Sequence, residues 1–154
     1  MNAKQINTIK NESKRVHDYL TNEINNRFCW IDLTTEASFA KEQGLSTVLL
    51  DDCVNPQVIN AIKETTIDSV SLFAFFDFLE LALGSKDEYL KEVLSTTIIE
   101  VLASEKDIKL ESVLIYCGEE TSKEIIRIKK EFFHDNKRAE ELLFYLAHKY
   151  SSSS

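Results

Sequence analysis

The segment SVSLFAFFDFLELALGS, residues 69–85, is the most apolar stretch of the chain and constrains its fold most strongly. It holds four of the nine phenylalanines, and its apolar residues follow helical spacing on one face and cover much of the remaining surface. A helix that is apolar nearly all round has to pack against neighbours on several sides. The segment therefore predicts the central helix of a helical domain, ended by Gly84.

Two carboxylates interrupt this segment, and they decide between three roles for it. Residues 67–83 would span ~25 Å as a helix, which is short for a bilayer, and they contain three acidic residues, so we expect no membrane contact. Asp77 and Glu80 lie three residues apart and share one narrow strip of the helix. This strip reaches solvent or meets a polar group, and it could form a docking edge together with Phe75 and Phe78.

The scarcity of chain breakers predicts an all-α fold, because only three glycines and one proline occur in 154 residues. Residues 3–25 carry one amphipathic stripe, and later helices are expected to start near 68, 86, 105, 121 and 137. These spacings of 16 to 19 residues make successive helices antiparallel neighbours. We predict a single helical domain over residues 1–150, as a bundle or a short HEAT-like stack, followed by a disordered tail at residues 151–154.

Several polar residues lie at the expected starts of helices, and one carboxylate borders an expected buried face. The expected caps are Thr34 or Thr35 for a helix ending at Gly44, Asn55 before Pro56, Ser85 with Glu88, Ser104 with Asp107, and Thr121 with Glu124. The stretch LSTVLL, residues 45–50, is more consistent with helix than with strand. Glu100 borders a buried face, and we expect it to accept hydrogen bonds from the start of a neighbouring helix.

The charge of the chain is acidic and unevenly distributed. The net charge is −8, with −2 over residues 1–67 (7 basic minus 9 acidic) and −6 over residues 68–154 (11 minus 17). An acidic surface repels nucleic acid and attracts a basic protein, so we expect a basic protein partner and no direct nucleic-acid contact. The candidate partner-binding residues are Asp77, Glu80, Glu88, Glu92, Asp107, Glu111, Glu119 and Glu120.

No catalytic or metal-binding signature is present in the sequence. The three histidines and three cysteines are widely spaced, and no phosphate-binding glycine loop occurs. We therefore expect no cofactor and no enzymatic activity, with buried, reduced thiols in a cytoplasmic protein. Two alternatives stay open: a helical-repeat adaptor for another protein, and an enzyme with a dispersed site built from carboxylates and His134 or His148.

Residues 72–104, LFAFFDFLELALGSKDEYLKEVLSTTIIEVLAS, followed by LIYCGEET, resemble small helical immunity proteins. The family is that of contact-dependent growth inhibition and related polymorphic toxin systems. The shared features are the aromatic helix, the short polar turn and the TTIIEVL helix, and they cover roughly the C-terminal half. The resemblance implies a cytoplasmic protein that binds the toxic domain of a cognate nuclease and blocks it. It carries no catalytic residues.

Overall fold

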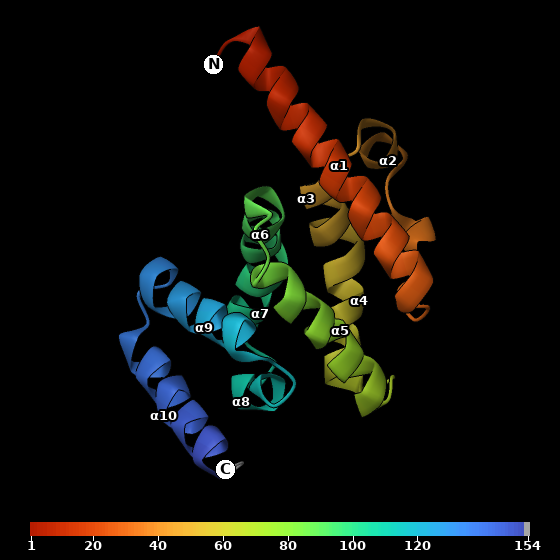
Figure 1. Ribbon diagram of the computed structural model, residues 1–154. Helices are drawn as coiled ribbons and strands as arrows, with labels where there is room; N and C mark the ends of the chain where they lie inside the picture. Colours follow the sequence, from red (N-terminus) through yellow and green to blue (C-terminus); the bar gives the residue numbers. More distant parts are fainter. Residues whose placement is uncertain (153–154) are drawn as a thin grey trace.

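The computed structural model describes residues 1–152, and within this range it consists of helices joined by short loops, without a strand (Figure 1). It confirms the all-α, single-domain prediction. The two ends of the chain lie at opposite ends of the molecule, with α1 (Ala3–Arg27) at one end and α10 (Asn136–Ser152) at the other. Ser151 and Ser152, which were expected in a disordered tail, are the last residues of α10. Residues 153 and 154 lie outside the described part of the chain.

The first half of the chain consists of α1 and a second helical rod, which runs continuously over residues 46–64. Asn2 caps α1 through a complete capping box with Gln5, and the helix ends at Arg27, two residues beyond the predicted end at Asn25. The following elements are a 3-10 turn η1 (Leu33–Thr35), α2 (Ser38–Gln43), α3 (Ser46–Val48), the π-helical η2 (Leu49–Val54) and α4 (Asn55–Glu64). The helical assignment of residues 45–50 is thereby confirmed.

Two predicted caps in this half are wrong because the helices begin elsewhere. Thr34 and Thr35 lie in the 3-10 turn η1, whose cap is Asp32, and α2 starts only at Ser38. Asn55 is buried inside a continuing rod, where its N–H donates to the carbonyl of Leu50 five residues back. Pro56 has no N–H and its ring crowds the carbonyl four residues earlier, so the wider π turn before it relieves that conflict.

The second half of the chain packs around α5. Its elements are α5 (Ser69–Leu83), α6 (Glu88–Leu94), the π-helical η3 (Ser95–Ile99), α7 (Glu100–Ser104), α8 (Leu110–Leu114), α9 (Glu119–Arg127), the π-helical η4 (Ile128–Phe132) and α10. Phe75, Phe76 and Leu79 of α5 are fully buried, and Phe75 meets the rings of Phe28 and Trp30 edge to face. The apolar segment is therefore a central core helix, as its composition predicted.

The arrangement is a bundle and not a stack of repeats. In a stack, each unit contacts only its neighbours in sequence. Here α1 packs against α6, and α5 packs against both α6 and α9, so distant segments close around one core. The π-helical segments η2 and η3 face one another where the rod of residues 46–64 crosses the rod of residues 88–104.

The starts of the later helices also differ from the prediction. Asp87, not Ser85, caps α6 by accepting from the N–H of Leu90, while the Ser85 hydroxyl donates to Ala82. Ser104 ends α7 and caps nothing. Residue 121 lies inside α9, which begins at Glu119, so the Thr121 box does not form.

The cysteines are all free thiols in different surroundings. Cys53 and Cys117 are buried, as expected, and burial raises the pKa of the Cys117 thiol to about 12. Cys29 is exposed, contrary to the prediction, because it follows the last turn of α1 and its side chain points away from the core.

Candidate partner-binding surface

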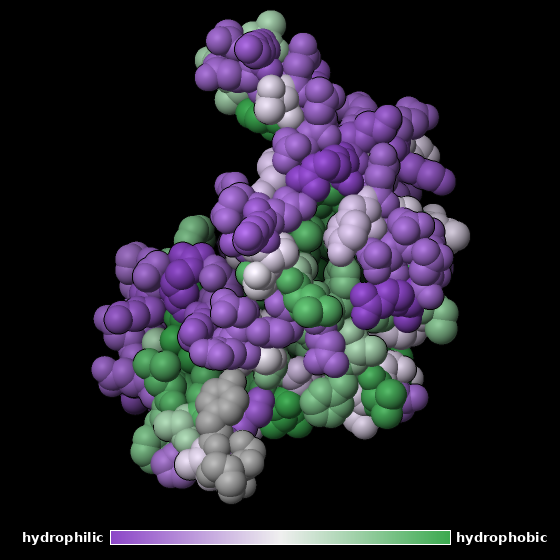
Figure 2. All heavy atoms as spheres, in the orientation of Figure 1, coloured by the Kyte–Doolittle hydropathy of each residue, from purple (hydrophilic) through white to green (hydrophobic). Residues whose placement is uncertain are grey.

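One face of α5 is left uncovered by the bundle. Val70 and Leu81 are 76% and 71% exposed, Phe73 is partly exposed, and Asp77 lies between them on the surface. Their spacings of three, four and four residues place them along one line of the helix. We call Val70, Phe73, Asp77 and Leu81 the α5 strip. Figure 2 shows hydrophobic atoms at the surface over the lower end of α5, interrupted by hydrophilic ones.

Of the residues expected to form an exposed docking edge, Asp77 lies on the surface, but the two aromatic residues do not. Phe75 and Phe78 are buried against Phe28 and belong to the core. The exposed apolar residues are instead those four positions before and four positions after Asp77. That spacing was the signal that could have identified Phe73 and Leu81, because residues four apart share one side of a helix.

Glu80 has a structural role that ties α5 to α9. Its Oε2 accepts the backbone N–H of Glu120 at 2.8 Å, and its Oε1 accepts the N–H and the hydroxyl of Thr121, each at 2.9 Å. A carboxylate at this position satisfies free N–H groups of the first turn and is favoured by the helix dipole. Glu80 therefore caps α9 from forty residues away in the chain, and its carboxylate is not available to a partner protein.

The close approach of Glu80 depends on Gly118, the residue that precedes α9. A Cβ at position 118 would lie 2.4 Å from Cδ of Glu80 and 2.6 Å from its Oε1. No side chain fits into that space. The position of Gly118 next to the Glu80 carboxylate explains why a residue without a side chain stands there.

The role expected for Glu100 belongs to Glu80 instead. Within the described residues, Glu100 accepts no hydrogen bond from a helix start. It faces Asp51 across the contact of η2 and η3, and burial, Asp52 and Glu100 together raise the pKa of Asp51. The prediction failed because the position of a neighbouring helix start is set by tertiary packing, which the local pattern around Glu100 does not contain.

Two unpaired carboxylates belong to the α5 strip or lie beside it. Asp77 has neither an ion pair nor a side-chain hydrogen bond among residues 1–152, and the same is true of Glu120. Glu120 lies at the Leu81 end of the strip, since its Cγ would be 3.7 Å from a Cβ on Gly84. At the other end, the ring of Phe73 packs against Tyr116 with centroids 4.7 Å apart.

Most of the other predicted acidic residues are paired with a cation of the chain itself. The pairs are Glu88 with Lys91 at 2.9 Å, Asp107 with Lys63 at 3.4 Å, Glu111 with Arg138 at 2.5 Å and Glu119 with Lys123 at 2.8 Å. The Arg138 guanidinium lowers the pKa of the Glu111 carboxyl. Glu92 has no such pair, but it lies on α6 away from the strip. The structure thus brings together only Asp77, Glu80 and Glu120 of the predicted set.

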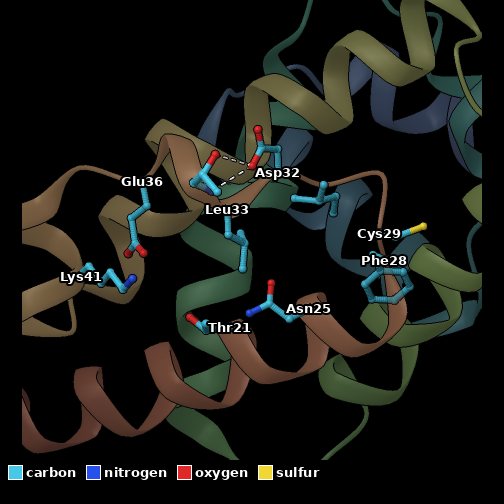
Figure 3. Close-up of a pocket in the computed structure, with 10 residues that line it drawn as sticks. Thr21, Asn25, Phe28, Cys29, Asp32, Leu33, Glu36 and Lys41 are labelled. Atoms are coloured by element: carbon cyan, nitrogen blue, oxygen red, sulfur yellow. Dashed lines mark hydrogen bonds between the residues drawn. The ribbon is translucent and has the colours of Figure 1, made fainter.

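A polar pocket of about 460 Å³ opens between α1 and the η1 turn (Figure 3). Thr21 and Asn25 point into it from α1, and Glu36 and Lys41 approach from the opposite side. Beside it, the Glu36 carboxylate lies 2.5 Å from Nε2 of His17, with side chains 4% and 5% exposed respectively. Sequence reasoning missed this buried pair.

The pocket does not contain the residues of the dispersed catalytic site considered above. His134 lies on the surface after η4, and His148 lies against Phe144 on α10. Across the described part of the chain, no three histidine, cysteine or acidic side chains are grouped in a way that could hold a metal ion.

Comparison with known proteins finds no match: no family model, curated protein or solved structure is similar to the chain. Within residues 1–152, none of the helices combines the length and apolar character needed to cross a membrane.

Proposed function

We propose that this chain is a protein-binding domain that docks a basic partner protein on the α5 strip. The observation that carries the proposal is an unpaired carboxylate, Asp77, within a line of exposed, large apolar side chains. Exposed apolar residues in a contiguous line, edged by polar groups, are characteristic of protein interaction sites.

The unpaired carboxylates of the surface indicate that the partner is basic. Among the described residues, Asp77 and Glu120 pair with no cation, so a lysine or arginine of a partner would neutralise them without breaking an existing pair. The other carboxylates of the C-terminal half add a long-range negative potential, although many are locally paired. This potential speeds the encounter with a basic protein more than it strengthens the final complex.

The α5 strip lies on a helix that the rest of the fold holds rigidly. Its helix is held by buried phenylalanines on one side and by the Glu80 contact with α9 on another. A rigid surface loses little conformational entropy on binding, which favours affinity.

The partner that we propose is the toxic domain of a nuclease, in agreement with the resemblance to immunity proteins. Nucleases carry basic surfaces to hold phosphates, and such a surface is complementary to the acidic residues of the strip. Binding there would cover the nuclease surface that holds its substrate, and the chain itself would need no catalytic group.

The test is co-expression with the polypeptide encoded by the adjacent gene, followed by a pull-down and a growth assay for toxicity. We expect the chain to restore growth of cells that express the toxin and to co-purify with it. Growth should not be restored by a variant that carries both Asp77→Arg and Leu81→Glu, although it folds normally. A wild-type chain that neither binds nor protects, or a double variant that protects equally well, would contradict the proposal.

A further inference from the structure

The first eleven residues of the chain form a helical arm that extends beyond the bundle. Every residue from 1 to 11 is exposed, and Figure 1 shows this end of α1 projecting away from the other helices. A helix this short is marginal in water without packing partners. We call residues 1–11 the arm.

The arm continues the face that α1 buries further along. Ile6 and Ile9 are 41% and 46% exposed, while Val16, Leu20 and Ile24 on the same stripe are fully buried. In Figure 2, the arm is largely hydrophilic, with hydrophobic atoms on the side toward the body. The apolar stripe therefore extends two helical turns past the end of its own packing surface.

A groove lies between the arm and the body of the molecule. One hollow of about 520 Å³ and a second of about 380 Å³ share Ile9, Thr47 and Tyr89, so they are continuous. The first hollow extends to Leu45, and the second extends to Glu92 on α6. We call this hollow the arm groove.

Two contacts fix the arm at its angle to the groove. The Ser13 hydroxyl donates to the carbonyl of Gly44 at 2.8 Å and accepts the N–H of Ser46 at 3.1 Å. The Arg15 guanidinium donates to both carboxylate oxygens of Asp87, at 2.7 and 3.0 Å. Because these contacts hold α1 in place just beyond the arm, the groove is a fixed feature of the fold.

The arm groove is lined by one charged side chain of each sign, Lys10 and Glu92. Lys4 and Lys10 are the charged side chains of the arm, and neither forms an ion pair among the described residues. Glu92, on the groove side, is exposed and forms no ion pair among residues 1–152 either. One patch thus combines exposed apolar side chains with an unpaired lysine and an unpaired glutamate, as a self-complementary interface requires.

We propose that the arm groove binds the arm of a second copy of this chain, so that two molecules pair around a two-fold axis. In such an interface the same patch serves both partners, which requires complementary halves on each chain. The two arms run antiparallel, with Ile6 and Ile9 of each covering Tyr89 and Leu45 of the other. Lys10 of one copy then reaches Glu92 of the second copy. This pairing is independent of the α5 strip and of the proposed function.

The test is a charge exchange, read out by sedimentation equilibrium from about 10 to about 500 μM chain. The wild type should form dimers in this range. Lys10→Glu and Glu92→Lys should each weaken self-association at least about tenfold, because like charges then meet at both contacts. An equimolar mixture of the two variants should recover the dimer, because each arm then faces an oppositely charged groove.

A matched pair of variants controls for net charge. Lys130→Glu and Glu140→Lys alter exposed, unpaired residues in η4 and α10, far from the arm, and should leave self-association unchanged. A wild type that is monomeric throughout the range overturns the proposal. So does a dimer that Lys10→Glu and Glu92→Lys leave intact, or a mixture of the two variants that stays monomeric.

Discussion

Replacing Glu80 with alanine is expected to lower the free energy of unfolding by about 3 kcal/mol, which is large for a side chain that is not fully buried. The change leaves two backbone N–H groups at the start of α9 and the Thr121 hydroxyl without their acceptor. Loss of a helix cap alone costs about 1 kcal/mol, and bonds to a charged acceptor are stronger than average. The free energy of unfolding of Glu80→Gln should lie between those of the wild type and Glu80→Ala, since glutamine keeps one acceptor oxygen and loses the charge.

Asp77→Ala is the matched control, because Asp77 lies one turn earlier on the same helix and has no partner in residues 1–152. It should change the free energy of unfolding by less than about 0.5 kcal/mol. Urea denaturation followed by circular dichroism measures both values. Equal stabilities for the two alanine variants would show that Glu80 does not hold α9.

Removing Glu36 is expected to be at least as costly, at about 3 to 5 kcal/mol for Glu36→Leu, because it leaves a buried imidazole without its partner. The Glu36 carboxylate and Nε2 of His17 are 2.5 Å apart and nearly inaccessible to solvent. Little compensates for this loss, since Nδ1 of His17 has no hydrogen bond within the described residues. The nearest other carboxylate, on Asp18, is 3.6 Å away and exposed.

A double-mutant cycle separates the pair from its surroundings. His17→Leu combined with Glu36→Leu should lose clearly less stability than the sum of the two single changes, since it removes both polar groups together. Glu42→Leu, at a nearby exposed position without an ion pair among the described residues, is the control for replacing a glutamate by leucine. Additive losses in the cycle would mean that the two side chains do not stabilise one another.

Local patterns were sufficient to predict which segments are helical but not how the helices begin. The apolar stretch of residues 69–85 predicted a core helix because no other environment satisfies a helix that is apolar on most sides. The cap of α9 could not be predicted from the residues around Thr121, because Glu80 of another helix occupies that role. At α6, the cap is Asp87 and not the predicted Ser85, and Asp87 also accepts hydrogen bonds from Arg15, which lower the pKa of its carboxyl.

The candidate site was predictable in part. The position of Asp77 on the surface follows from the pattern, and helical spacing places Phe73 and Leu81 beside it. The pairing of Glu111 with Arg138 and of Asp107 with Lys63 joins residues 27 and 44 positions apart. Only the packed bundle shows that these carboxylates are already neutralised. In the same way, His17 lies on the buried stripe of α1, but its partner comes from an irregular segment without a recognisable period.

The affinity of the chain for the polypeptide encoded by the adjacent gene, measured by calorimetry on three purified forms, tests the proposed role of the α5 strip most directly. Leu81→Glu alters the strip, and Phe144→Glu alters a comparably exposed apolar residue, 68% accessible, on α10. We predict that Leu81→Glu weakens binding at least about tenfold and that Phe144→Glu leaves it within about twofold of the wild type. Equal affinities for the wild type and Leu81→Glu, or a loss confined to Phe144→Glu, would contradict the proposed binding site.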